Sequence, residues 1–208
     1  MLSRLLQRYD AQLVMRPLRT KSITAFGISV ATDVSLQRLV PPPAPKQSSS
    51  SGASLDARRI ARQSIWSGAI MAPMLHHWFK LLERVPALGP LPGPIVRLAV
   101  DSATLMPLSH VLYFAYMSFW VHGGSTTYIS ADLHANLPPA LKAGYVVIPA
   151  TMLVNLTLVP LRARVLFVNL VLGAGWGGFL NLMANTPTPA PAASKSGQML
   201  RRWSMPYT

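Results

Sequence analysis

The sequence predicts an all-α integral membrane helical bundle with four transmembrane helices and a fifth segment that spans or half-spans the bilayer. Half of the residues are hydrophobic and only 12% are charged, whereas a soluble domain carries about 25% charged residues. The apolar residues also form long stretches, and residues 165–184 contain no charge at all. About 20 such residues cross the hydrocarbon core as a helix, and helices satisfy their own backbone hydrogen bonds there.

The charge distribution supports the same class. The chain has 19 Lys and Arg residues against 6 Asp and Glu, which gives a net charge of +13. A basic balance by itself favours nucleic acid, but these cations gather at the chain ends and between the apolar stretches, where they can reach lipid phosphates. We therefore expect membrane lipids, and no nucleic acid, as partners. The chain has no Cys, which excludes disulfides and thiolate chemistry.

The expected transmembrane domain covers residues 17–184 and follows a basic N-terminal arm, residues 1–16. The composition of the arm fits either a mitochondrial import signal or an uncleaved membrane-flanking segment, and we expect the second. The first helix is expected at 17–40, with Pro17 in its first turn. A Pro/Ser-rich loop, residues 41–57, follows it.

A second helix is expected at 57–84 with a kink at Pro73, and a third at 95–121, where Gly123 and Gly124 end it. We expect residues 125–139 to form a polar connection.

The last apolar region is divided by Pro160. Residues 143–159 reach only the lower limit for a span, so this is the ambiguous fifth segment, and 165–184 form the last helix. A Pro-rich basic tail, 185–208, ends the chain. Small residues at four-residue spacing in the last helix predict close helix packing: they are Gly173 and Gly177, with Gly178 on the offset row.

No constellation of residues predicts an enzyme. Adjacent His76 and His77 point about 100° apart on a helix and cannot share a metal, and no phosphate-binding glycine loop or metalloprotease motif is present. We expect no catalytic residue, no metal and no cofactor. A bound phospholipid such as cardiolipin is the one non-protein component expected, with Arg162 and Arg164 as candidates for contact with its headgroup.

Two acids fall inside apolar stretches, Asp33 and Asp101. A charge inside the membrane is costly and by default faces protein or water. Arg97 lies four residues before Asp101 and is expected on the same helical face. Each acid therefore forms either a structural ion pair or part of a solvated pore lining.

Four groups of residues follow one another in a recognisable order. The first is Tyr9, Leu13, Pro17, Thr20, Thr24, Asp33 and Gln37. The second is Gly68, Pro73, His76, Trp78, Phe79 and Leu82. The third is Arg97, Asp101 and Pro107. The fourth is Pro149, Asn155, Val159, Pro160, Arg164, Asn169 and Trp176. In spacing they resemble the motifs of the Mpv/PMP family of small multi-pass mitochondrial inner-membrane and peroxisomal membrane proteins, over about residues 9–182.

The resemblance implies a set of family-matched polar residues that are candidates for a pore lining: Asp33, Gln37, His76, Asp101, Asn155 and Arg164. The chain departs from the family pattern at Thr32, Ala72, Ser102, Ile148, Met152, Leu156 and Asn181. Two of these changes, Ser102 and Met152, stand at amide positions of the family. The fold is expected to survive them, whereas an activity that needs those amides is in doubt.

Two functions remain open. The partial loss of polar positions favours a non-enzymatic structural accessory subunit of a larger mitochondrial inner-membrane assembly of the respiratory type, with other membrane-protein subunits as partners. The alternative, which the resemblance suggests, is a weakly selective small-solute channel, because a pore needs a wettable lining. The basic N-terminus and the resemblance favour the mitochondrial inner membrane, with a peroxisomal or other organellar membrane as the alternative.

Overall fold

The computed structural model describes residues 2–39, 55–88 and 92–184, and all the elements in these ranges are helices. The predicted all-α class is therefore confirmed. The elements are α1 (Leu2–Met15), α2 (Pro17–Leu39), α3 (Ala57–Ile65), the π-helical turn η1 (Trp66–Met71), α4 (Ala72–Leu82), α5 (Gly93–Ala103), α6 (Leu105–His122), α7 (Thr126–Leu158) and α8 (Arg164–Ala184). Most of the loop 41–57 and the whole tail 185–208 lie outside the described residues.

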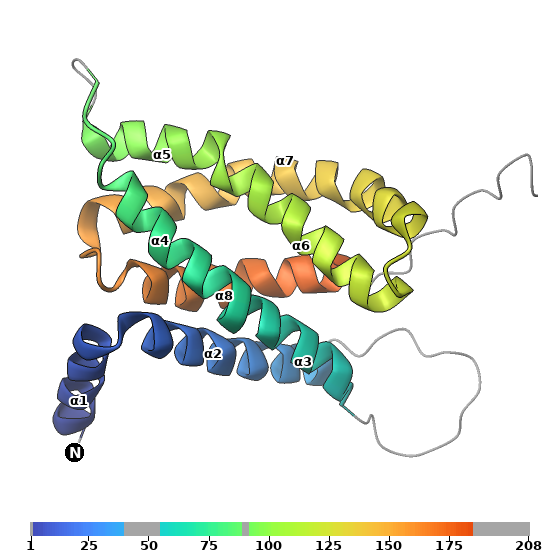
Figure 1. Ribbon diagram of the computed structural model, residues 1–208, viewed down its shortest axis with the longest axis horizontal. Coiled ribbons are helices and arrows are strands. Elements are labelled where there is room, and N and C mark those ends of the chain that lie inside the picture. Colours follow the sequence, from blue (N-terminus) through green and yellow to red (C-terminus); the bar gives the residue numbers. More distant parts are fainter. Residues whose placement is uncertain (1, 40–54, 89–91, 185–208) are drawn as a thin grey trace, which may run out of the picture.

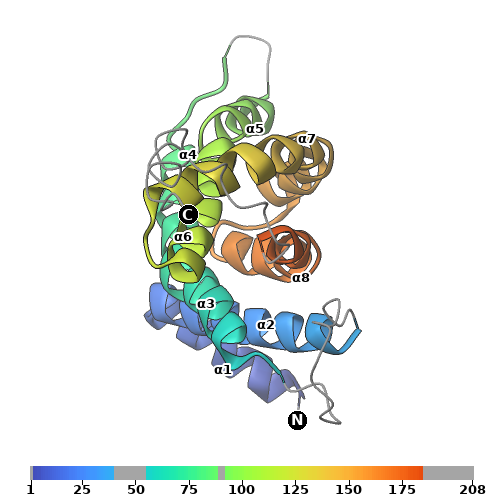
Figure 2. The ribbon, with the colours of Figure 1, turned by 90° about the vertical axis from the view of Figure 1, so that its right-hand side faces the viewer.

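The long helices lie roughly side by side, with α8 between α2 and α7 (Figures 1 and 2). The run of α3, η1 and α4 crosses α2 and α8 obliquely, and α5 and α6 pack on α7. The basic N-terminal arm is helical: α1 meets α2 at Arg16 and stands at a steep angle to it. Helix α8 contacts α2, α4, α6 and α7, so it is the central element of the bundle.

Three helical runs are long and apolar enough to cross a membrane: Gly93–His122, Thr126–Leu158 and Arg164–Ala184. The other two long runs, α2 and α3–η1–α4, do not reach this standard within the described part of the chain. They contain more polar residues, among them Asp33, Gln37 and Gln63. The multi-span membrane class is thus supported, while the number of four spans stays a prediction.

The expected polar connection at 125–139 is wrong. Helix α7 runs unbroken through this segment and contains Pro138, Pro139 and Pro149. Prolines are tolerated in membrane helices because neighbouring groups satisfy the backbone atoms that they free. Here α7 packs along α6, Ala140 is fully buried, and His122 Nε2 lies 3.4 Å from Asp132 Oδ2. The ambiguous segment 143–159 is therefore the second part of one long helix.

Two irregularities interrupt the other expected helices. The irregularity expected near Pro73 is the π turn of η1, which inserts an extra residue immediately before α4. The expected third helix is divided at Thr104 into α5 and α6, three residues before Pro107. In both places the chain continues in the same general direction (Figure 1).

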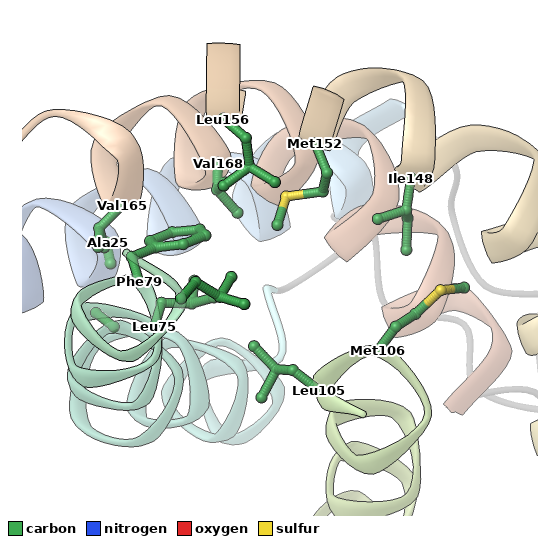
Figure 3. Close-up of a cluster of buried hydrophobic side chains, with 12 residues drawn as sticks. Ala25, Leu75, Phe79, Leu105, Met106, Ile148, Met152, Leu156, Val165 and Val168 are labelled. Atoms are coloured by element: carbon green, nitrogen blue, oxygen red, sulfur yellow. The ribbon is translucent and has the colours of Figure 1, made fainter. Parts of the chain in front are cut away.

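The core is formed where five helices meet. Side chains from α2, α4, α6, α7 and α8 point toward one another (Figure 3). Met152, which stands at an amide position of the resembled family, and Leu156 lie in this cluster with Phe79 and Val165. Position 152 therefore contributes an apolar contact to the core of this chain.

Because three runs expose apolar side chains suited to lipid, we expect the protein to remain in the membrane pellet after extraction with alkaline carbonate and with high salt. Large side chains such as Val146, Leu158 and Leu170 are 64–78% exposed in the isolated chain, and apolar surface of this kind is stable in hydrocarbon. Immunoblotting of pellet and supernatant measures the outcome. Release by carbonate alone would refute the membrane assignment.

Candidate functional site

A cavity of about 130 Å³ lies inside the bundle and is bordered by α3, η1, α4, α5, α6, α7 and α8. Its lining on α8 extends from Val168 to Leu180, about 18 Å of helix at 1.5 Å per residue. The cavity therefore runs along the helices. Most of its lining is apolar. The polar or amphipathic side chains are Gln63, Trp66, Ser67, Asp101, Ser109, His110, Tyr113, Asn169 and Trp176.

Hydrogen bonds fix several of these polar side chains. His110 Nδ1 lies 2.7 Å from the Met106 carbonyl, and Trp176 Nε1 donates to His110 Nε2 at 3.3 Å. A carbonyl only accepts and an indole only donates, so Nδ1 carries the proton and the imidazole is neutral. Tyr113 donates to Gln63 Oε1 at 3.0 Å. Hydrogen bonds within the protein thus hold these polar side chains of the lining in place.

Asp101 borders the cavity but does not pair with Arg97, contrary to our expectation. It is 3% exposed and accepts a hydrogen bond from Trp78 Nε1 at 2.7 Å. Arg97 instead pairs with Glu83, with Nη1 3.2 Å from Oε1. Six residues were predicted as pore-lining candidates. Of these, only Asp101 is found in the lining of the cavity, within the part of the chain that the structure describes.

Asp33 and Gln37 belong to a polar cluster that joins α2, α3 and α8. Asp33 is fully buried, and its Oδ1 accepts from Arg59 Nε at 3.0 Å and from Asn181 Nδ2 at 2.6 Å. Gln37 donates to Asp33 Oδ2 at 3.0 Å and accepts from the Asp56 backbone N–H at 2.7 Å. These residues are structural here. Asn181, a departure from the family pattern, supplies one of the hydrogen bonds.

A second cluster is centred on Glu83, which was not among the predicted site residues. Its carboxylate accepts from both Arg97 and Arg164. Arg164 is 6% exposed, and its Nε and Nη2 also donate to the carbonyls of Val159 and Leu156 at 3.0 Å. Arg164 therefore holds the end of α7 against α4 and α8, and it is not placed to contact a lipid headgroup. In the sequence, nothing distinguishes Glu83 as a site residue except that it is one of six acidic residues in the chain.

Arg162 remains accessible. Its side chain is 60% exposed and lies 3.7 Å from Asp10 of α1, which is 54% exposed. This is a solvent-exposed pair, of a kind that contributes little to stability. The predicted headgroup role therefore stays open for Arg162.

His76 contacts a buried lysine that the sequence analysis did not single out. Lys21 is 2% exposed, and its Nζ lies 3.1 Å from His76 Nδ1. Burial lowers the pKa of His76 to about 4, and the positive charges of Lys21, Lys80 and His77 add to the effect. His76 is therefore neutral at pH 7 and accepts from the ammonium group. Burial, and then Lys80, also lowers the pKa of Lys21.

Asn155 is fully buried, and neither atom of its amide has a hydrogen-bond partner within the described ranges. It is not among the residues that line the cavity. Leaving such a group unpaired costs about 1–3 kcal/mol, and we have no physical account of its position.

The glycines separate into two groups. At Gly68, an added Cβ would lie 2.8 Å from Phe26 Cβ and 2.9 Å from the Ser22 carbonyl oxygen, which is too close. Gly178 faces Leu36 at 3.1 Å. At Gly173 and Gly177, however, the nearest atoms would be at 3.9 and 3.8 Å and belong to α8 itself. The predicted packing role thus fits Gly178, whereas Gly173 and Gly177 line the cavity because their row of α8 faces inward.

Within residues 2–39, 55–88 and 92–184, no group of three His, Asp or Glu side chains could hold a metal ion. The fold and the site together define a multi-span helical membrane protein with a cavity among its helices and two polar clusters that join them.

Comparison with known proteins gives the family. The model of the Mpv17 / PMP22 family matches residues 118–181. The peroxisomal membrane protein PMP22 of Arabidopsis thaliana is 30% identical over 192 residues, covering 91% of this chain and 95% of that protein. Protein sym-1 of Neurospora crassa is 32% identical, covering 85% and 97%. Peroxisomal membrane protein 2 of Bos taurus is 31% identical, covering 81% and 84%. No solved structure matches. The chain belongs to the Mpv17 / PMP22 family.

Proposed function

We propose that this protein is a non-enzymatic channel of an organellar membrane, in which the central cavity passes small polar solutes with weak selectivity. The observation that carries the proposal is the cavity itself, which follows α8 for about 18 Å and presents oriented polar groups along an otherwise apolar wall. Its volume of about 130 Å³ accommodates several water molecules. Ordered donors and acceptors in a narrow lining are what selectivity for small solutes requires.

In this proposal, the cluster around Asp33 and the cluster around Glu83 lie toward the two ends of the passage. Tyr113 and Gln63 border the cavity on the side of the Asp33–Arg59 pair. At the other end, Asp101 is bonded to Trp78 of α4, the helix that leads to Glu83. In this proposal, side chains in these two regions control access to the passage.

The second candidate is the structural accessory subunit. One observation favours it: Asp33, Gln37 and Arg164, which were candidates for a pore lining, are used instead in hydrogen bonds that hold helices together. The tail and most of the loop 41–57 lie outside the described residues and do not bear on the choice. Co-migration with a large assembly on native gels, together with no solute flux through the purified chain, supports this candidate over the channel.

Two signals bear on the organelle. The basic N-terminal arm favours the mitochondrial inner membrane, and the names of the Arabidopsis and bovine relatives favour the peroxisomal membrane. Fractionation of cells that express the tagged full chain separates the two.

Filling the cavity is expected to block the channel without unfolding it. Gly173→Leu places a large side chain in the cavity, where the nearest atom to an added Cβ is 3.9 Å away. We expect this variant to lose most of the solute flux measured in reconstituted liposomes. Its melting temperature should be unchanged or higher, because substitutions that fill a cavity commonly stabilise the folded protein.

Gly175→Leu is the matched control. It lies on the same helix, has no atom within 4 Å of an added Cβ, and does not line the cavity. It should conduct like the unmodified protein. Equal flux through both leucine variants would exclude the central cavity as the route.

A further inference from the structure

A second hollow lies outside the bundle core, where four segments meet at one end of the molecule. It measures about 500 Å³ and is bordered by α1, the first turns of α2, the second half of α4 and the connection between α7 and α8. These segments converge at the end that carries α1 (Figure 1). We call it the α1 groove. Its basic side chains are Lys21, His76, Lys80 and Arg162, and the rest of its lining is apolar.

The charges of the α1 groove are unbalanced. Lys21 is 2% exposed, and its bonded neighbour is a neutral histidine. Among the described residues, no ion pair includes Lys21 or Lys80, and Arg162 pairs only with the exposed Asp10, which does not line the groove. A buried charge without a counter-charge is strongly unfavourable. The buried Lys21 therefore has no counter-charge among the described residues, and the exposed Lys80 adds a second cation that forms no ion pair there.

The remaining lining indicates what kind of anion fits. Leu13 and Val14 of α1, Phe79 of α4, and Leu161 and Val165 beside the α7–α8 connection form the other walls. Such a surface suits hydrocarbon rather than a hydrated ion. One wall of the groove, Pro160 to Arg162, lies in the connection where α7 ends and α8 begins, so it lies where two candidate spans end. That is the depth at which phospholipid phosphates lie.

We propose that the α1 groove binds the phosphate of an anionic phospholipid, with Lys21 and Lys80 as its cationic contacts and the apolar side chains against the adjoining acyl chain. His76 holds the Lys21 ammonium at 3.1 Å and so orients it. Arg162, at the rim, is released from Asp10 to contact the same headgroup. The site is separate from the central cavity and does not depend on solute conduction.

The test is thermal unfolding of the purified full chain in a zwitterionic detergent, with dioleoyl phosphatidylglycerol, dioleoyl phosphatidylcholine or inorganic phosphate added. A ligand that binds the folded state raises the melting temperature with its concentration. We expect phosphatidylglycerol to raise it in a saturable way, and phosphatidylcholine and inorganic phosphate to leave it unchanged. An equal rise with inorganic phosphate would overturn the assignment to lipid and leave a free-phosphate site.

Two variants locate the effect. Lys80→Met removes a charge at an exposed position, so folding is not at risk, and it should weaken the response to phosphatidylglycerol. Lys21→Met should abolish the response. Without lipid it should also melt higher than the unmodified protein, because it removes a buried cation that has no counter-charge. A purely structural lysine predicts the reverse, a lower melting temperature.

Lys142→Met is the control for non-specific attraction, since Lys142 lies on α7 and does not line the groove. It should respond to phosphatidylglycerol like the unmodified protein. The proposal is overturned if Lys21→Met and Lys80→Met keep the full response, or if Lys142→Met loses as much of it as they do.

Discussion

Replacing Asp33 by alanine is expected to lower the free energy of unfolding by about 3–5 kcal/mol, the range for removing one partner of a buried ion pair. The carboxylate is fully buried and accepts hydrogen bonds from Arg59, Gln37 and Asn181. Its loss leaves the Arg59 guanidinium, whose side chain is 11% exposed, without its carboxylate. Three helices, α2, α3 and α8, lose the contact that joins them. Thermal or denaturant unfolding in detergent measures the change.

Asp10→Ala is the matched control for Asp33→Ala. Asp10 also pairs with an arginine, but both side chains are more than half exposed and the separation is 3.7 Å. Exposed pairs of this kind contribute about 0–1 kcal/mol, so Asp10→Ala should unfold close to the unmodified protein. If the two alanine variants lose the same stability, the buried cluster does not hold the three helices together.

Replacing Gly68 by alanine is the second large effect that we expect. The added Cβ would approach Phe26 Cβ to 2.8 Å and the Ser22 carbonyl oxygen to 2.9 Å. Real Cβ atoms essentially never approach other atoms this closely, and both neighbours belong to the body of α2. The turn η1 must therefore move away from α2. Overpacking of this kind costs about 1–3 kcal/mol, which should appear as a lower melting temperature.

Gly27→Ala provides the comparison, because Gly27 lies on α2 next to Phe26 and an added Cβ there meets nothing within 4 Å. Alanine is a better helix former than glycine by about 1 kcal/mol, so Gly27→Ala should be neutral or slightly stabilising. A Gly68→Ala variant that is as stable as Gly27→Ala would show that α2 and η1 are not in close contact.

The helix positions were largely predictable. The first helix was expected at 17–40 and is found at Pro17–Leu39, and the last was expected at 165–184 and is found at Arg164–Ala184. These bounds depend on local signals, namely proline at the start, apolar content along the helix and a proline break at its end. The same signals failed at 125–139, because the prolines there are accommodated by packing of α7 against α6.

The pairing of polar side chains in the site was less predictable, because each of them has several possible partners in the sequence. Arg97 was expected to pair with Asp101, four residues away on the same helix, but Glu83 lies within reach across the α4–α5 connection and takes it. Arg164 was a candidate for contact with lipid, yet the same Glu83, 81 residues earlier in the chain, pairs with it in the interior. Lys21 was not predictable as a site residue, because nothing in the sequence shows that it is buried beside His76.

The sequence by itself determined the class: an all-helical membrane chain of the Mpv17 / PMP22 family, with its apolar segments in their order. Those properties depend on composition, and on steric preferences that act within a few residues. The tertiary structure alone decided which polar side chains meet, as Asn181 meets Asp33 from 148 positions away, and which glycines pack and which line the cavity. The reason is geometric. Successive residues of a helix point about 100° apart, so a small rotation or shift of one helix against another changes every partner, and only packing of the whole bundle fixes that rotation.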